Sequence, residues 1–195
     1  MLERALDLVG PHCDIEKRLR DIPASARVRG IWVHNIEREL TRLGLKEKYL
    51  GYVGSSPSAL AWYPLDGAVV RLAVAGALAA SPRELSAGLR QLARAQAVHF
   101  ADSLLGRTML RLLSTDPVRV LQQGAAARRQ TCSYGRWDYD FGTPRKCVVT
   151  HVDEYAWLDS QVIGSAEGTM EAIGVPATFD LVLSDPYNGV LTITW

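Results

Sequence analysis

Two cysteines and a histidine are the first side chains in this sequence that could bind a metal ion. Cys147 and His151 have the Cys-x-x-x-His spacing, and Cys132 opens the stretch CSYGRWDYDFGTPRKC that leads to them. On a β-strand, residues four apart are separated by about 13 Å, which is too far for one coordination shell. Because β-branched residues favour a strand here, we predict no metal ligand among these three side chains.

Asp138 and Asp140 could act as a carboxylate pair in a hydrolase or transferase. The alternation of this stretch predicts a β-hairpin with its loop at residues 142–144, which places Asp140 opposite Lys146. A lysine in that position favours two ionised carboxylates on a solvated face. We therefore name no catalytic residue, and catalysis by this pair is the alternative.

The other face of the same hairpin is aromatic. It carries Trp137 and Tyr139, and the predicted register places Tyr139 opposite Cys147. In that register Cys132 lies far along the sheet from Cys147 and on the opposite face, which excludes a disulfide between them.

His99 lies on a predicted helix within one turn of Asp102 and Ser103. One helix carries all three residues and no oxyanion hole is indicated, so they do not predict a catalytic triad. Two interpretations of His99 are open: a hydrogen-bonded core histidine, or a haem or metal ligand. Arg107 follows Gly106 at a helix boundary, where its guanidinium either binds a ligand carboxylate or caps a helix end.

The composition excludes several classes of protein. Twenty-two basic and 21 acidic residues leave a formal net charge of +1, which disfavours binding to nucleic acid. The acidic N-terminus lacks the pattern of an export signal, and the most apolar segment, residues 68–80, is shorter than the roughly 20 residues of a membrane span. An odd count of three cysteines fits a reducing compartment, so we expect a cytoplasmic protein.

Helical spacing of apolar residues predicts that the first two thirds of the chain are helical. One helix is expected from about residue 26 to residue 43, and a buried apolar helix over residues 68–80. Ser81-Pro82-Arg83-Glu84 is a capping-box pattern with proline at the first helical position, and it opens a long helix that reaches about Ser103.

From Thr131 the hydrophobic period changes to two, which predicts strands. After the hairpin, a helix that ends at Gly174 and two strands around residues 185–189 complete a ββαββ order. Helices followed by strands predict an α+β fold with an antiparallel sheet and helices packed on it. We expect one globular domain over residues 1–195, with an N-terminal extension (1–22), a helical part (23–130) and the ββαββ part (131–195).

Five short motifs resemble, in their order and spacing, a myxobacterial paralogous family of uncharacterised proteins of about this size. They are Arg29-Gly30, Trp62-Tyr63-Pro64, Phe100-x-x-Ser103-x-x-Gly106-Arg107, Ser133-Tyr134-Gly135 and the C-terminal tryptophan. The resemblance runs from about Pro23 to Trp195 and implies no particular activity.

The order of helices and strands also resembles a fold shared by haem nitric-oxide-binding domains, vinyl-reductase-like (V4R) ligand domains and Bet3-type subunits of vesicle-tethering (TRAPP) complexes. This resemblance implies a pocket between helices and sheet, and a dimer. The haem domains hold the porphyrin propionates with a tyrosine-x-serine-x-arginine pattern, whereas residues 133–136 read Ser-Tyr-Gly-Arg. We therefore expect no cofactor.

An aromatic-rich inner face without a catalytic constellation favours a non-enzymatic module that senses a small ligand or lipid or binds a protein. The expected partners are a small apolar or amphipathic ligand, a protein partner or a second copy of the chain. The residues expected to line the pocket are Trp62, Tyr63, His99, Arg107, Tyr134, Trp137 and Tyr139. The alternatives are a hydrolase or transferase that uses Asp138 and Asp140, and a haem sensor that uses His99.

Overall fold

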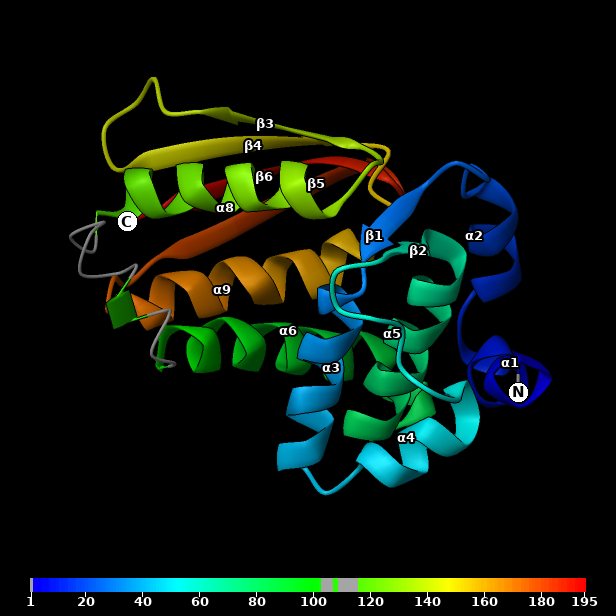
Figure 1. The fold of residues 1–195 in the computed structure, drawn as a ribbon. Helices are drawn as coiled ribbons and strands as arrows, with labels where there is room; N and C mark the ends of the chain where they lie inside the picture. Colours follow the sequence, from blue (N-terminus) through cyan, green and yellow to red (C-terminus); the bar gives the residue numbers. More distant parts are fainter. Residues whose placement is uncertain (1, 103–106, 109–115) are drawn as a thin grey trace. The chain divides into compact units, whose positions relative to one another are not determined.

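The structure, a computed structural model, describes residues 2–102, 107–108 and 116–195 (Figure 1). The chain forms two compact units. Unit 1 comprises Met1–Leu92 and Thr131–Tyr134, and unit 2 comprises Ala93–Gln130 and Gly135–Trp195. The single domain expected from the sequence, with its three parts, stays a prediction.

Unit 1 is mainly helical, and α5 (Leu65–Ala79) lies at its centre. The other helical elements are α1 (Leu2–Val9), the 3-10 helix η1 (Gly10–His12), α2 (Ile15–Asp21), α3 (Ile31–Arg42), α4 (Lys46–Val53), the 3-10 helix η2 (Pro82–Glu84) and the first part of α6 (Leu85–Asp102). Helices α1, α3 and α4 pack against α5. Because α5 is apolar on nearly all sides, it is buried, as the sequence predicted.

The helix expected from residue 26 begins only at Ile31, because the residues before it form a strand. In β1 (Arg27–Arg29) the chain pairs antiparallel with β2 (Trp62–Pro64). Gly30 joins β1 to α3 and lies so close to the segment before β2 that an added Cβ would be 2.1 Å from the carbonyl oxygen of Ser58. The close approach requires glycine at this position. The pairing of β1 with β2, which are distant in sequence, thus replaces the first turn of the helix that the apolar spacing predicted.

A second segment of unit 1 comes from much later in the chain. Residues 131–134 lie against β1: the amide of Arg27 donates to Ser133 Oγ at 2.9 Å, and the amide of Ser133 donates to the Arg27 carbonyl oxygen at 2.9 Å. The change to strand geometry that was expected at Thr131 occurs at Arg136 instead, since α8 (Pro117–Thr131) continues to that threonine.

The capping-box pattern is followed by a helix, as predicted. Ser81 Oγ donates to Glu84 Oε2 at 3.1 Å, and η2 leads directly into α6. Helix α6 is described as far as Asp102; Ser103 and Gly106 lie outside the described residues.

Unit 2 contains a four-stranded antiparallel sheet with the strand order β3-β4-β6-β5. The strands are β3 (Arg136–Asp140), β4 (Lys146–Val152), β5 (Thr178–Asp185) and β6 (Asn188–Thr194). Between β4 and β5 a short π-helical turn, η3 (Leu158–Val162), leads into α9 (Ile163–Ala172). The ββαββ order, the turn between β5 and β6 and the α+β class are confirmed.

The β3–β4 register differs by two residues from the predicted one. Tyr139 faces Val149 rather than Cys147, and Asp140 faces Val148 rather than Lys146. The connection is longer than predicted because the amide of Gly142 donates to Asp140 Oδ1 at 2.8 Å and Arg145 adopts a φ of 57°. Since a shift of two preserves the faces of a strand, the predicted division into an aromatic and a charged face is correct.

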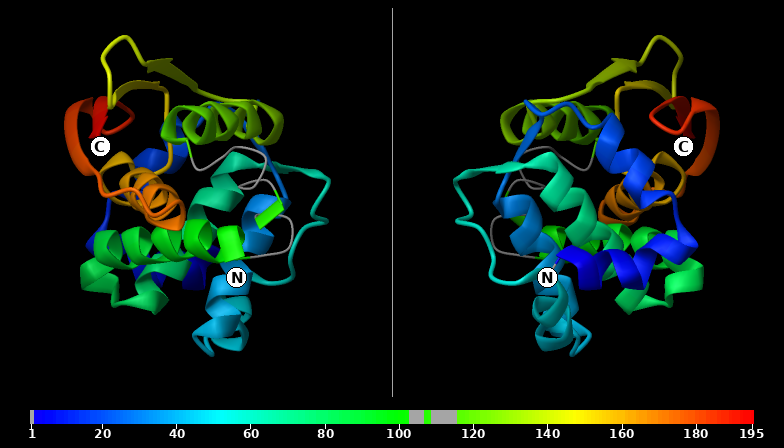
Figure 2. Two further views of the ribbon diagram at one scale, coloured as in Figure 1. Left: turned by 90° about the vertical axis from the view of Figure 1, so that its left-hand side faces the viewer. Right: turned by 90° about the vertical axis from the view of Figure 1, so that its right-hand side faces the viewer.

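The core of unit 2 lies on the aromatic face of the sheet. Helices α8 and α9 both pack there, against Cys147, Val149, Leu191 and Ile193, and the views along the strands show both helices on the same side (Figure 2). The opposite face, called the outer face below, carries Asp138, Asp140 and the exposed valines Val182 and Val190.

In the described part of the chain, no single helix has both the length and the apolar character needed to cross a membrane. One pair, α5 with residues 82–101, meets those criteria together but is bent by 115°.

Candidate functional site

A buried carboxylate organises one end of the sheet in unit 2. Glu154 follows β4 and is 1% exposed. Its Oε2 accepts hydrogen bonds from Arg128 Nη2 and from Trp137 Nε1, each at 2.7 Å, while Oε1 accepts from the amide of Ala156 at 3.0 Å. The Arg128 guanidinium also lies over the Trp137 ring, 4.8 Å from its centroid. These bonds join α8, β3 and the entrance to η3.

His151 lies beside this carboxylate and has unmet hydrogen-bonding capacity. It is 1% exposed on the aromatic face of β4, and neither ring nitrogen has a hydrogen-bond partner among the described residues. Its ring packs edge-on against Trp137, with 4.7 Å between the centroids. Burial lowers the pKa of His151 to about 4; Glu154 acts against this shift and Arg128 adds to it. The imidazole is therefore neutral at pH 7.

Unit 1 has a buried polar cluster of its own, around Arg71 of α5. The guanidinium donates to the carbonyl oxygens of Val53 and Ser55, at 2.8 Å and 2.6 Å, and to the Tyr63 hydroxyl at 3.3 Å. Its Nη1 lies 4.0 Å from Oε1 of the buried Glu37. Arg71 thereby holds the segment after α4 and strand β2 against α5, which is a structural role.

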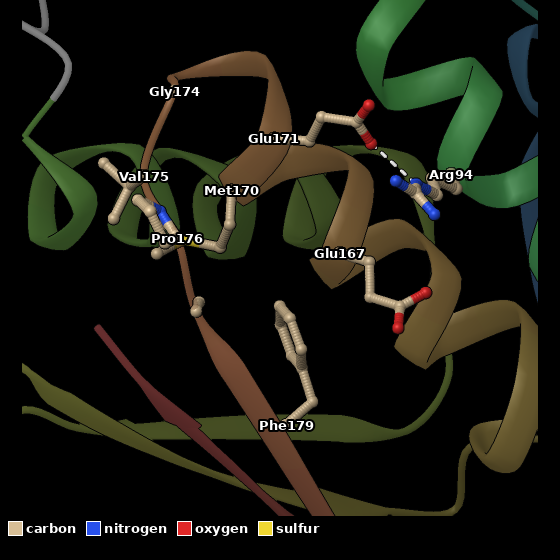
Figure 3. A pocket seen from close by; sticks show the side chains of 9 residues that line it. Arg94, Glu167, Met170, Glu171, Gly174, Val175, Pro176 and Phe179 are labelled. Atoms are coloured by element: carbon tan, nitrogen blue, oxygen red, sulfur yellow. Dashed lines mark hydrogen bonds and ion pairs between the residues drawn. The ribbon is translucent and has the colours of Figure 1, made fainter.

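A cleft of about 470 Å³ opens in unit 2 at the C-terminal end of α9 (Figure 3). Its apolar lining comes from α9, from the loop after it and from the start of β5: Met170, Val175, Pro176, Ala177 and Phe179. Charged side chains line it too, namely Arg94 of α6 and Glu167 and Glu171 of α9. Arg94 Nε donates to Glu171 Oε2 at 2.6 Å.

The backbone around the cleft is set by two glycines. At Gly174, which has a φ of 69°, α9 ends in a Schellman motif: the Gly174 amide donates to the carbonyl oxygen of Glu171, and the Val175 amide to that of Met170. At Gly168 the helix lies so close to α6 that an added Cβ would be 2.3 Å from the carbonyl oxygen of Arg94. The close crossing brings Arg94 within reach of Glu171.

The seven predicted pocket residues are divided between the two units. Unit 1 contains Trp62, Tyr63 and Tyr134, and unit 2 contains His99, Arg107, Trp137 and Tyr139. None of the seven lines the cleft described above. That they form one pocket stays a prediction.

The predicted residues of unit 1 face different surroundings. Trp62 is 44% exposed, with the Arg29 guanidinium 4.1 Å from its ring centroid. Tyr63, its neighbour in β2, bonds to Arg71, while Tyr134 is buried.

The predicted residues of unit 2 also differ in how far their side chains are buried. Trp137 and Tyr139 lie on the aromatic face, where Tyr139 stacks on Phe141 with centroids 6.1 Å apart. His99 is half-buried on α6, and Arg107 is exposed. Trp137 joins the cluster around Glu154.

Asp138 and Asp140 lie on the outer face of β3 and are exposed. Arg136 Nε donates to Asp138 Oδ2 at 2.6 Å, and Asp140 accepts from the backbone in its turn. An acid/base pair of carboxyl groups needs one of the two to be shielded from water, and both of these are exposed. The geometry does not support catalysis by this pair.

The serine and arginine that correspond in type to the propionate-binding pattern of haem domains are each bonded to other groups of the protein. Ser133 is bonded to the backbone of β1 in unit 1, whereas Arg136 lies on the outer face of β3, paired with Asp138. The described residues therefore do not fit a haem held in that manner, and among them no group of three His, Cys, Asp or Glu side chains could hold a metal ion. Cys13, Cys132 and Cys147 are all free thiols.

Sequence reasoning missed Arg128 and Glu154, and it considered His151 only as a partner of Cys147. The one signal for Glu154 was a carboxylate within the largely apolar stretch HVDEYAWL. Gly174 was correctly predicted to end a helix, but nothing in the sequence indicated that α6 would meet α9 there.

Comparison with known proteins agrees with this architecture. The model of the DUF2378 family, described as a protein of unknown function, matches residues 23–195. No curated protein matches the chain.

Solved structures of H-NOX proteins share the fold at 13–14% sequence identity, and each alignment covers 85% of this chain. A variant of Tt H-NOX aligns with a TM-score of 0.65 over 94% of its own length. The Fe(II) unliganded H-NOX protein from K. algicida gives 0.63 over 95%. An oxygen-binding H-NOX domain related to soluble guanylate cyclases, in its oxygen complex, gives 0.58 over 91%.

Proposed function

We propose that this chain, which belongs to the DUF2378 family, is a non-enzymatic sensor module that binds a small apolar or amphipathic ligand in the cleft of unit 2. The observation that carries the proposal is the cleft itself. Its volume of about 470 Å³ lies within the usual range for small-molecule sites, about 300–1,000 Å³, and its lining combines apolar side chains with a few charged groups.

The fold likeness supports a ligand-binding role without naming the ligand. The H-NOX structures include an unliganded form and an oxygen complex, so the architecture accommodates a small-molecule site in those proteins. In this chain the Glu154 carboxylate and the Arg71 guanidinium are bonded to the protein itself. The cleft, by contrast, is open to a ligand, and the proposal rests on it.

Binding of octan-1-ol, followed by saturation-transfer NMR and calorimetry on the full chain, tests the proposal. Ala177→Phe adds a ring inside the cleft and should weaken binding at least tenfold. Val182→Phe adds similar bulk on the outer face of the sheet and should leave binding unchanged. No binding to the wild-type chain, or equal binding to both variants, would contradict the proposal. Phe179→Leu provides a second cleft variant if Ala177→Phe does not fold.

The haem-sensor alternative requires only one absorption spectrum. Because Ser133 is bonded to the backbone of β1 and Arg136 to Asp138, we expect no Soret band from protein supplied with haem during expression. A stable Soret band that is lost in His99→Ala would favour the alternative.

A protein-interaction role is the second candidate, favoured by the outer face of the sheet. Val182 and Val190 are paired across β5 and β6 and are 63% and 37% exposed. Sedimentation of the wild-type chain and of Val182→Lys would test it, since a charge at that position should weaken any association through this face.

A further inference from the structure

Strand β5 lies at one edge of the four-stranded sheet in unit 2 (Figure 1). In the described part of the chain it pairs with β6 alone, so the peptide groups on its other side take no part in the sheet. Such an edge is a template for pairing with another strand, and proteins usually block it with lysine, proline, charges, a bulge or a short strand.

The opposite edge, β3, has the features that block pairing. It is five residues long, and its outer face carries three exposed charged residues, Arg136, Asp138 and Asp140. Strand β5 is eight residues long and contains neither lysine nor proline. Its pairing becomes irregular only after Leu183, which leaves residues 178–183 regular. Of the two edges, β5 is the one that is open to a partner.

Apolar side chains are exposed on both faces of β5 at the same place. Val182, on the outer face, is 63% exposed. Leu183 belongs to the face that α8 and α9 cover, because it pairs with Gly189, which pairs in turn with His151. It is nevertheless 43% exposed. A partner packed on the outer face would cover Val182 and leave Leu183, whereas a strand added at the edge would cover both.

We infer that two copies of this chain associate through antiparallel pairing of β5 with β5 of the second copy, which joins the two sheets into one. A two-fold axis makes such a contact isologous, so the surface has to be complementary to itself. The residue pattern of β5 meets this requirement in one register, as the next two paragraphs describe. The inference goes beyond the proposed ligand binding and does not depend on it.

Charge and regularity select the register. Directly opposite residues of an antiparallel pair share a face, so the two-fold axis passes through a residue. An axis at Asp180 would place two carboxylates opposite each other, which is destabilising. An axis at Val182 would extend the pairing beyond Leu183 into the irregular part of the strand. An axis at Leu181 avoids both and pairs residues 179–183.

With the axis at Leu181, every pair on the inner face is apolar. Leu181 lies opposite its own copy, and Phe179 lies opposite Leu183. On the outer face Asp180 lies opposite Val182, and both positions are exposed, so the carboxylate stays hydrated. The exposed leucine of the edge thus becomes part of a continuous apolar layer.

Sedimentation velocity of the full chain, from about 5 to about 200 µM, tests the association, and we expect a reversible monomer–dimer equilibrium. Val182→Asp places a second carboxylate opposite Asp180 and should weaken dimerisation at least tenfold. Val182→Lys places an ammonium there and should preserve or strengthen it. Packing through the outer face requires the opposite for Val182→Lys, because two lysines would then be buried together.

Two further variants complete this set. Asp138→Lys changes an exposed charge on the opposite edge and should leave dimerisation unchanged. Leu183→Asp, which faces Phe179 of the second copy, replaces Val182→Asp if that variant does not fold. A wild-type chain that stays monomeric over the whole range, or a dimer that Val182→Lys weakens as much as Val182→Asp does, overturns the inference.

Cysteine cross-linking determines the register. An equal mixture of Asp180→Cys and Val182→Cys should form disulfide-linked dimers under mild oxidation, since opposite Cβ atoms lie about 4.5–5.5 Å apart. Each variant alone should form far fewer. The wild-type chain is the control for its own free thiols. More cross-linking of either variant alone than of the mixture overturns the axis at Leu181.

Discussion

Each of the two units buries a charged cluster, and the two clusters differ in the kind of group that lacks a hydrogen-bond partner among the described residues. In unit 1 these groups are Arg71 Nη1 and the Tyr49 hydroxyl, and in unit 2 the group is the imidazole of His151. In unit 1 the Arg71 guanidinium donates to two carbonyl oxygens and a tyrosine hydroxyl, and a carboxylate lies nearby. In unit 2 the Glu154 carboxylate accepts hydrogen bonds from Arg128, Trp137 and the amide of Ala156, whereas both nitrogens of the adjacent His151 lack a partner in the part of the chain that the structure describes.

This difference determines how each cluster responds to conditions. An arginine stays charged at every pH at which the protein folds, so the Arg71 cluster acts as a fixed structural tie. A buried histidine can gain a proton near neutral pH once the chain unfolds. The histidine of the cluster in unit 2 therefore couples stability to pH.

Removing the guanidinium in unit 1 should have the largest effect. In Arg71→Met, Glu37 loses its nearest cation while it is still buried, and the carbonyl oxygens of Val53 and Ser55 lose their donor. Breaking one side of a buried ion pair costs about 3–5 kcal/mol. Urea unfolding followed by tryptophan fluorescence measures the loss.

The matched control is Arg136→Met, which removes an ion pair on the exposed surface that is shorter, at 2.6 Å, than the 4.0 Å between Arg71 and Glu37. Exposed pairs contribute about 0–1 kcal/mol. If Arg71→Met cost no more than Arg136→Met, the Arg71 cluster would not be the tie that its geometry indicates.

Acidification should destabilise the protein through His151. Its pKa is lowered to about 4 in the folded chain from an ordinary value of 6.5, so the unfolded chain binds the proton more tightly. The contribution is absent above pH 6.5 and destabilises progressively as the pH falls toward 4. Between pH 7.5 and pH 5 the expected loss is about 2 kcal/mol.

His151→Phe isolates this effect from other titrating groups. Phenylalanine keeps the ring contact with Trp137 and removes the two unpartnered nitrogens, so stability at pH 7.5 should be equal or higher. The difference in unfolding free energy between pH 7.5 and pH 5 should shrink by about 2 kcal/mol. An unchanged pH dependence in this variant would contradict the assignment to His151.

The sequence predicted those parts of the fold that depend on local pattern. The apolar run of α5 and the turn at residues 185–189 depend on neighbouring residues, and both are present. The change to strand geometry was also predicted, but it occurs at Arg136 rather than at Thr131. The start of α3 was predicted wrongly because β1 depends on β2, more than thirty residues away. The β3–β4 register was wrong by two residues because an aspartate side chain bonded within the turn and extended it.

The candidate site was harder to predict for the same reason. The residues of the cleft come from α6, from α9 and from β5, and the crossing that joins them depends on Gly168 lying against the backbone of Arg94. Nothing in the spacing along the chain indicates such a crossing. The alternation of Trp137 with charged residues predicted that it lies on the inner face of the sheet. Its hydrogen bond to Glu154 was not predicted, because the pairing of β3 with β4 brings the two residues together.

A smaller effect should follow when the Glu154 cluster loses one donor. Trp137→Phe keeps a ring against His151 and removes the indole N–H that donates to Glu154 Oε2. The expected loss is about 1–2 kcal/mol, since hydrogen bonds to buried charges exceed the neutral average. Trp62→Phe is the control, because Trp62 is 44% exposed, and it should cost less than about 1 kcal/mol. Similar losses in both variants would mean that the bond to Glu154 adds no stability.

The smallest effect should come from the ion pair at the cleft. Its distance of 2.6 Å matches the shortest bond of the Arg71 cluster, but both side chains are about half exposed. If burial rather than distance sets the energy, Glu171→Gln should cost less than about 1 kcal/mol in urea unfolding. A loss comparable to that of Arg71→Met would show instead that this pair supports the crossing of α6 and α9, and that the contrast between buried and exposed pairs does not hold in this protein.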